Sequence, residues 1–185
     1  MKFTYSRQDP GLIAAVAFAN QLGADESFWA EIAAQPQFKF TALSSPAISQ
    51  RLRACPTPVD VVHFSSIDPR LRKTVAITSP KRPFLIAYHT KFMSNSVGAK
   101  VKTLAHEFVH NADFFGDGSR TLEYTHSQSP SPDWPLTAPY WIGGLAQRRY
   151  EAAYPAKAHQ KSAGFDVFDD AFEDDFVDIE DSEIE

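Results

Sequence analysis

The residues best suited to chemistry in this chain stand on one short stretch, Leu104-Ala105-His106-Glu107-Phe108-Val109-His110. Residues four apart share one face of an α-helix, so His106 and His110 can bind one metal ion if the stretch is helical. Glu107 stands beside them, where its carboxylate can take a proton from a water on that ion. This pattern, His-Glu-x-x-His, predicts a metal-dependent hydrolytic site.

The sequence around the stretch favours a helix. A polar residue at 94–96 can cap its N-terminus, and Gly116 or Gly118 can end it. Apolar residues recur at intervals of three and four, as on a helix that buries one face: Val97, Val101, Leu104, Ala105, Phe108 and Ala112. We therefore expect a buried helix with the two histidines emerging at the edge of its apolar stripe.

This stretch resembles the active-site helix of zincin-type zinc metallopeptidases, whose signature is His-Glu-x-x-His. The resemblance covers the helix and a few flanking elements. It implies a Zn²⁺ cofactor held by His106 and His110, with Glu107 as general base in the hydrolysis of a protein or peptide substrate. The metzincin subfamily is excluded, because Met1 and Met93 both precede the helix and that subfamily needs a methionine turn after it.

Catalytic zinc usually takes three protein ligands and leaves the fourth position to water, so a third ligand must lie outside the motif. His126 is the first candidate, because an imidazole is a strong zinc ligand and a loop after the helix can fold back over the metal. Asp113 is the second candidate, although it could instead accept a hydrogen bond from an imidazole N–H. Asp117 and Glu123 follow, and Glu151 on the last helix would suit a gluzincin arrangement.

A hydrogen-bond donor is also needed for the oxyanion that forms during peptide hydrolysis. Tyr124 and Tyr140 lie in the region after the helix, where zincins often place a Tyr or His for this role. We therefore expect one of these two tyrosines to act as a catalytic residue beside Glu107.

Three short runs rich in β-branched and aromatic residues, at 59–64, 74–78 and 84–90, predict strands of one sheet before the motif helix. The five residues 79–83 are too few for a crossover helix, so the last two strands should form an antiparallel hairpin. In zincins a sheet precedes the metal helix, and its edge strand lies along a cleft where an extended peptide can add as another strand. The expected fold is thus α+β and zincin-like, with a small mixed or antiparallel sheet.

The other predicted elements frame this centre. Asp9 and Pro10 supply the cap and first position of a helix, and residues 25–27 begin a second one. The remaining predictions are a strand over 38–43, a helical turn over 48–53 and a last helix over 145–154 ended by Pro155.

Composition predicts one domain over 1–160 and an acidic tail over 161–185. The chain has 185 residues, 43% of them hydrophobic, which is enough for a substantial core. Its single cysteine excludes an intramolecular disulfide, and no apolar run reaches the ~18 residues that a membrane-spanning helix needs. We expect a soluble protein, cytoplasmic or secreted without a convincing signal peptide, since the start signals at Asp9 and Pro10 favour a globular helix over a leader.

Charge divides the chain sharply. Residues 165–185 carry 11 of the 23 acidic residues and no basic ones, whereas 1–164 carry all 18 Lys and Arg. Phenylalanines at 165, 168, 172 and 176 would share one face of a helix, so the tail is either disordered or folds on a protein partner or on the basic body. The basic body contains no RNA-binding motif or zinc finger, so nucleic-acid binding has little support.

Two alternatives to a peptidase stay open on the sequence alone. A zincin-like chain could hydrolyse another amide, or it could be a catalytically silent binding protein. The biological setting also stays open between a housekeeping enzyme, a phage product and an injected effector toxin with this protease activity.

Overall fold

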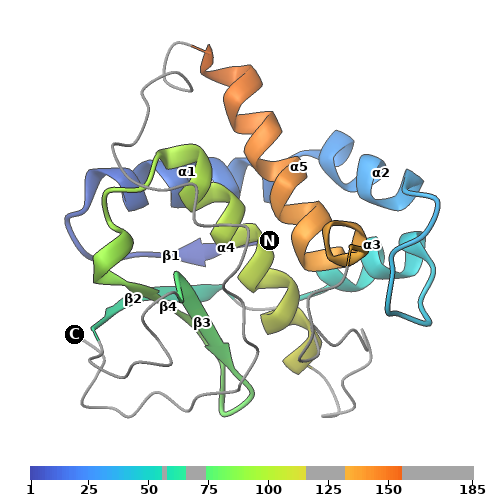
Figure 1. Ribbon diagram of the computed structural model, residues 1–185, viewed down its shortest axis with the longest axis horizontal. Coiled ribbons are helices and arrows are strands. Elements are labelled where there is room, and N and C mark those ends of the chain that lie inside the picture. The colour runs from blue at the N-terminus through green and yellow to red at the C-terminus, as the bar shows by residue number, and fades with distance from the viewer. Residues whose placement is uncertain (56–57, 66–73, 116–131, 156–185) are drawn as a thin grey trace.

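The motif stretch lies in α4 (Val97–Phe114), the central helix of the fold in a computed structural model (Figure 1). The structure describes residues 1–55, 58–65, 74–115 and 132–155. A sheet lies on one side of α4, and α5 (Ala138–Ala153) packs against another side. Ser96 caps the start of α4 as predicted, because its hydroxyl accepts a hydrogen bond from the backbone N–H of Ala99 at 3.2 Å.

The sheet has four strands in the order β1-β2-β4-β3. Their bounds are Phe3–Thr4 for β1, Val59–Phe64 for β2, Ala76–Ser79 for β3 and Arg82–His89 for β4. β1 and β2, and β2 and β4, pair in parallel, whereas β3 and β4 form the predicted antiparallel hairpin. The fold is thus α+β with a small mixed sheet, as expected. β1 was not predicted, because a strand of two residues shows no periodicity.

One predicted strand is wrong. Residues 38–43 form turns and bends rather than a strand. Phe40 has a φ of 58°, in the left-handed region, which interrupts an extended run. Phe38 is nevertheless buried, with its ring centroid 5.6 Å from that of Trp141, so the apolar character of the segment reflects packing against α5.

The first two helices begin where the sequence predicts. α1 (Pro10–Ala24) is capped by Asp9, whose carboxylate accepts a hydrogen bond from Leu12 N–H at 2.6 Å. Asp25 caps α2 (Glu26–Ala34) in the same way through Ser27 N–H at 2.8 Å. An aspartate at the N-cap satisfies an otherwise unpaired helix N–H and favours the positive end of the helix dipole.

Two later helices extend beyond their predicted bounds. α3 covers Ser45–Arg53 rather than one turn from 48. α5 begins at Ala138 rather than 145, so the glycines at 143 and 144 lie inside the helix. Pro139 in the first turn starts α5, since proline lacks an N–H that would be unpaired there anyway. Short 3₁₀ turns at Thr90–Phe92 and Trp134–Leu136 precede α4 and α5.

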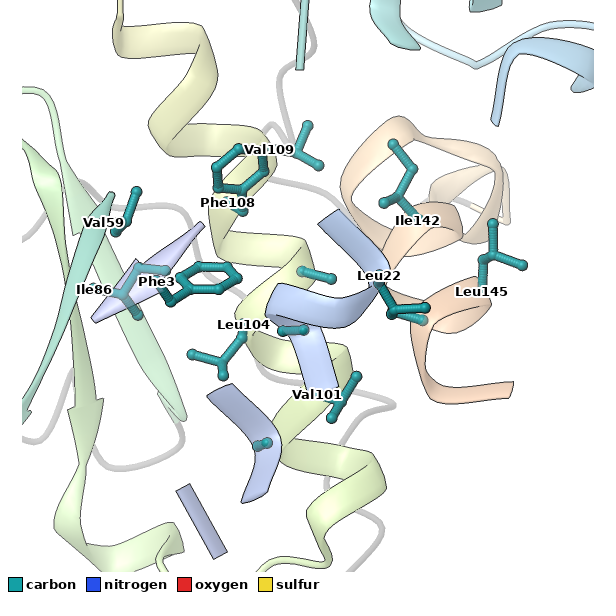
Figure 2. Close-up of a cluster of buried hydrophobic side chains, with 14 of the residues drawn as sticks. Phe3, Leu22, Val59, Ile86, Val101, Leu104, Phe108, Val109, Ile142 and Leu145 are labelled. Carbon is teal, nitrogen blue, oxygen red and sulfur yellow. The ribbon is translucent and has the colours of Figure 1, made fainter. Parts of the chain in front are cut away.

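The hydrophobic core surrounds α4 on most sides. Figure 2 shows Phe3, Val59 and Ile86 of the sheet beside the α4 side chains Leu104 and Phe108. Toward α5, the same cluster continues through residues of three helices: Leu22, Val101, Val109, Ile142 and Leu145. Each such side chain contributes about 1.5–3 kcal/mol on burial, so α4 is fixed mainly by apolar packing. Of the helices in the described part, none combines the length and apolar character needed to cross a membrane.

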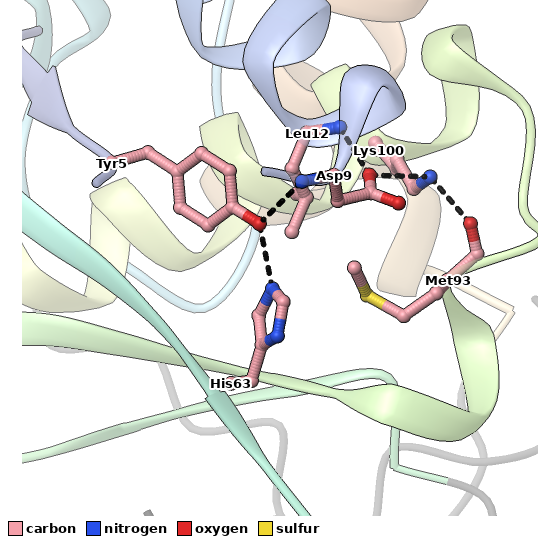
Figure 3. A network of polar contacts seen from close by, with 6 residues as sticks. All are labelled: Tyr5, Asp9, Leu12, His63, Met93 and Lys100. Carbon is pink, nitrogen blue, oxygen red and sulfur yellow. Dashed lines mark hydrogen bonds and ion pairs between the residues drawn. The ribbon is translucent and has the colours of Figure 1, made fainter. Parts of the chain in front are cut away.

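A polar network attaches the N-terminal segment to the first half of α4 (Figure 3). Lys100 is buried, with its Nζ 3.4 Å from the Asp9 carboxylate and hydrogen-bonded to the Met93 carbonyl. Burial lowers the pKa of Lys100, and the nearby Asp9 carboxylate opposes that shift. The Tyr5 hydroxyl links His63 Nε2 at 2.8 Å to the backbone N–H of Asp9 at 3.4 Å.

His89 should make the stability of the fold depend on pH below neutrality. Its buried ring contacts the rings of Phe64 and Phe92, and its Nδ1 accepts a hydrogen bond from Lys91 N–H at 3.1 Å. Burial lowers the pKa of His89, so below pH ~6.5 the unfolded chain binds a proton that the folded chain does not. The free energy of unfolding should therefore decrease as the pH is lowered below about 6.5. This group contributes at most about 1.4 kcal/mol per pH unit to that decrease.

The variant His89→Asn tests this contribution, because its amide oxygen can still accept from Lys91 N–H but does not titrate. Urea unfolding from pH 8 to pH 5 should show a shallower loss of stability in the variant than in the wild type. Parallel curves for the two proteins would show that His89 does not contribute.

Candidate metal site

His106 and His110 face each other on α4. Their Nε2 atoms are 3.3 Å apart, and their ring centroids are 5.1 Å apart with the planes inclined by 56°. Two nitrogens bound to one tetrahedral zinc ion at 2.0–2.1 Å lie about 3.3–3.4 Å from each other. The nitrogen separation of the pair thus suits a shared zinc ion. The same separation suits a hydrogen bond between neutral imidazoles, which holds the pair together when they share no ion.

The two histidines differ in exposure. His106 is only 1% exposed, whereas His110 is half-buried. The expectation that both emerge at the edge of the apolar stripe is therefore wrong for His106. Tyr140 of α5 covers it, with ring centroids 4.7 Å apart and planes inclined by 89°. Trp134 in turn stacks on Tyr140 at 6.1 Å, so an aromatic pair borders the site on this side.

A close approach of two helices puts Tyr140 in this position. A Cβ atom on Gly143 would lie 2.9 Å from the Lys102 carbonyl oxygen and 3.3 Å from the His106 Cβ. Only glycine lets α5 pack this closely, and Tyr140 stands three residues earlier on the same face. In sequence this glycine is a helix breaker, whereas in the structure it is the contact point between α4 and α5.

Glu107 lies between the histidine face and the sheet face of α4. It is 3% exposed, and its position around the helix falls between those of His110 and Asn111. Asn111 is fully buried and hydrogen-bonds to β4, so its side of α4 faces the sheet. Sequence reasoning missed Asn111, although a polar residue directly after the motif and beside the apolar stripe was a usable signal.

The described residues do not supply a third ligand. Within them, no three His, Cys, Asp or Glu side chains form a group that could hold a metal ion. Asp113 is half-buried one turn beyond His110 and does not complete such a group. The predicted ligands and donor His126, Asp117, Glu123 and Tyr124 lie outside the described residues and stay predictions.

Glu151 lies too far along the helices to bind the same ion. Its carboxylate accepts a hydrogen bond from Gln147 at 2.8 Å and would be 3.5 Å from a Cβ on Gly98. Gly98 precedes His106 by eight residues, about 12 Å along an α-helix. The gluzincin arrangement with Glu151 as third ligand is therefore wrong.

No protein-family model, curated protein or solved structure matches this chain.

Proposed function

We propose that this protein is a zinc-dependent endopeptidase of the zincin type. The observation that carries the proposal is the His106–His110 pair, whose 3.3 Å nitrogen separation suits one zinc ion, with Glu107 next to it on the same buried helix. Two imidazoles and a carboxylate in this order are the residue types that metal-assisted amide hydrolysis needs.

Each residue of the proposed site has a separate role. His106 and His110 would hold the ion, with a third ligand from outside the described residues, for which His126 is the first candidate. Bound zinc lowers the pKa of a water and polarises the scissile carbonyl. Glu107 would take the proton of the attacking water and pass it to the leaving amine as the C–N bond breaks. The Tyr140 hydroxyl would donate to the oxyanion, a role that Tyr124 could share or replace.

The sheet offers a place for an extended peptide substrate. Among the described strands, β3 stands at the edge of the sheet, antiparallel to β4, and both strands pack against α4. An extended peptide can add to such an edge through backbone hydrogen bonds, as peptide substrates do in zincins. This favours a protein or peptide substrate over a small amide. The acidic tail lies outside the described residues, and its folding on a protein partner stays part of the proposal.

Zinc stoichiometry tests the proposed site. Purified protein reconstituted with zinc and then dialysed should retain one ion per chain by elemental mass spectrometry. His106→Ala and His110→Ala should each lose it, because two remaining ligands bind zinc far more weakly than three. The control is His89→Asn, which alters a buried histidine on β4 and should keep the ion. If the wild-type protein retains no zinc after reconstitution and dialysis, the proposal is wrong.

A further inference from the structure

We infer that Asn111 is a positioning residue, which fixes the rotation of α4 and thereby the direction in which His106, Glu107 and His110 face. Asn111 is completely buried. Its side-chain amide donates to the Pro83 carbonyl at 2.9 Å and to the Leu85 carbonyl at 3.3 Å. The residue thus joins the motif helix to the strand β4 by two directional bonds. The link to zinc binding rests on the proposed function, whereas the link to helix orientation does not.

The Asn111 bonds meet β4 near the start of its pairing with β2. β4 begins at Arg82, but its pairing with β2 begins only at Leu85, opposite Asp60. Near this end of β4, the two carbonyls therefore lie where pairing with β2 begins, and the Asn111 amide donates to both. The Asn111 amide nitrogen donates to two carbonyl oxygens of β4. A flipped amide would instead point its own oxygen at those two carbonyl oxygens. The orientation of the side chain is therefore fixed.

The Asn111 oxygen points away from those carbonyls. It is buried and accepts no hydrogen bond within the described part of the chain. The two N–H donors are therefore the part of the side chain that links α4 to β4. A replacement that keeps the shape but removes the donors tests this link directly.

A second contact at the same place is not directional. The rings of Phe84 and Phe115 lie 4.5 Å apart, and this pair holds the end of α4 near the start of β4. Packed rings can slide and rotate at little cost, whereas hydrogen bonds weaken as their distance and angle depart from the preferred values. Among these contacts, Asn111 is therefore the one that specifies helix rotation.

Rotation of α4 about its axis would turn His106, Glu107 and His110 together relative to the elements around them. Asn111 directly follows His110 and stands one turn beyond Glu107, so the three residues turn together. The separation of the His106 and His110 nitrogens would survive, because both residues belong to the same helix. What would change is their direction relative to Tyr140 on α5 and to any ligand outside α4. Loss of Asn111 should thus alter the His106–Tyr140 contact and weaken zinc binding without destroying the histidine pair.

The test compares Asn111→Leu with Ser49→Ala. Leucine has nearly the same shape as asparagine but no donors. Ser49 is also buried and donates one hydrogen bond, at 2.9 Å, to the Trp29 carbonyl between α3 and α2. Both variants lose buried hydrogen bonding, but only Asn111 lies on the motif helix. If the Asn111 hydrogen bonds only stabilised the fold, the His106–Tyr140 contact and the zinc affinity should respond in the same way in the two variants.

The first measurement uses NMR on the metal-free protein. The Tyr140 ring stands edge-on to His106, so the His106 ring protons should show a ring-current shift and cross-relaxation with Tyr140. Both signals should change in Asn111→Leu and stay as in wild type in Ser49→Ala. If Asn111→Leu does not fold, Asn111→Ser, which keeps one donor and leaves room for a water, should show a smaller change of the same kind. Wild-type signals in a folded Asn111 variant would overturn the inference.

The second measurement is zinc affinity by competition with a chelator, at a temperature where all variants are folded. Asn111→Leu should bind zinc 10- to 100-fold more weakly, the range typical for residues that orient metal ligands. Ser49→Ala should stay within about twofold of wild type, because its bond lies outside the groups that orient the ligands. Equal affinity of Asn111→Leu and wild type would count against positioning. If the wild type itself binds no zinc, the proposed function fails, and the NMR comparison still decides the role of Asn111.

Discussion

Replacing Glu107 by Gln should lower kcat/KM for peptide hydrolysis about 10²- to 10⁴-fold, the range that a general base contributes. Gln has almost the same shape as Glu, but its amide cannot take a proton from the attacking water. The zinc content should stay at one ion per chain, because the histidine pair is unchanged. The loss should therefore appear in turnover and not in metal binding.

Burial makes this substitution informative about chemistry rather than folding. Glu107 is 3% exposed, and a neutral amide is less costly to bury than a carboxylate. Thermal unfolding of the variant beside the wild type checks that it folds. The matched control is Glu151→Gln, which neutralises a carboxylate beside Gly98, about 12 Å along α4 from His106, and should keep full activity.

Initial rates on a fluorogenic peptide or on casein, at saturating zinc, would decide between a peptidase and the alternative functions. Equal rates for Glu107→Gln and wild type would show that Glu107 is not the base. A zinc-loaded wild type without any turnover on peptides would instead support the catalytically silent binding protein or a hydrolase of another amide.

Replacing Gly143 by Ala should destabilise the protein by about 1–3 kcal/mol, the usual cost of overpacking a core. The added Cβ would be 2.9 Å from the Lys102 carbonyl oxygen, and a backbone atom inside α4 cannot move alone. α5 must therefore shift away from α4, and the Tyr140 ring with it. Zinc affinity should fall as well if the proposed site is correct, because His106 loses its cover.

The neighbouring Gly144 supplies the control. The nearest atom to a Cβ there is in the flexible Arg148 guanidinium, at 3.4 Å. Gly144→Ala should stabilise the protein by about 0.5–1 kcal/mol, because alanine has less conformational entropy to lose in a helix interior. Urea unfolding should thus show opposite signs for two adjacent substitutions of the same chemistry. If both variants are stabilised, the close contact between α4 and α5 does not exist.

Local features of the fold followed from sequence because their causes are local. A cap such as Asp9 or Asp25 acts on N–H groups two or three residues away, so sequence alone could place the start of a helix. The hairpin of β3 and β4 followed from the short connection between two apolar runs. The candidate site was predictable to the same extent, since the spacing of His106 and His110 on a helix brings their nitrogens together.

Other features depend on elements that are distant in sequence, and only the tertiary structure decided them. The burial of His106 requires Tyr140 and Gly143 on a helix that begins 32 residues later, at Ala138. The bonds of Asn111 require the point on β4 where pairing with β2 begins. Periodicity reports which face of one element is apolar, but it does not report which other element covers that face. Motif spacing therefore determined which side chains can share an ion, whereas the packing of α5 and β4 on α4 decided how those side chains are covered and aimed.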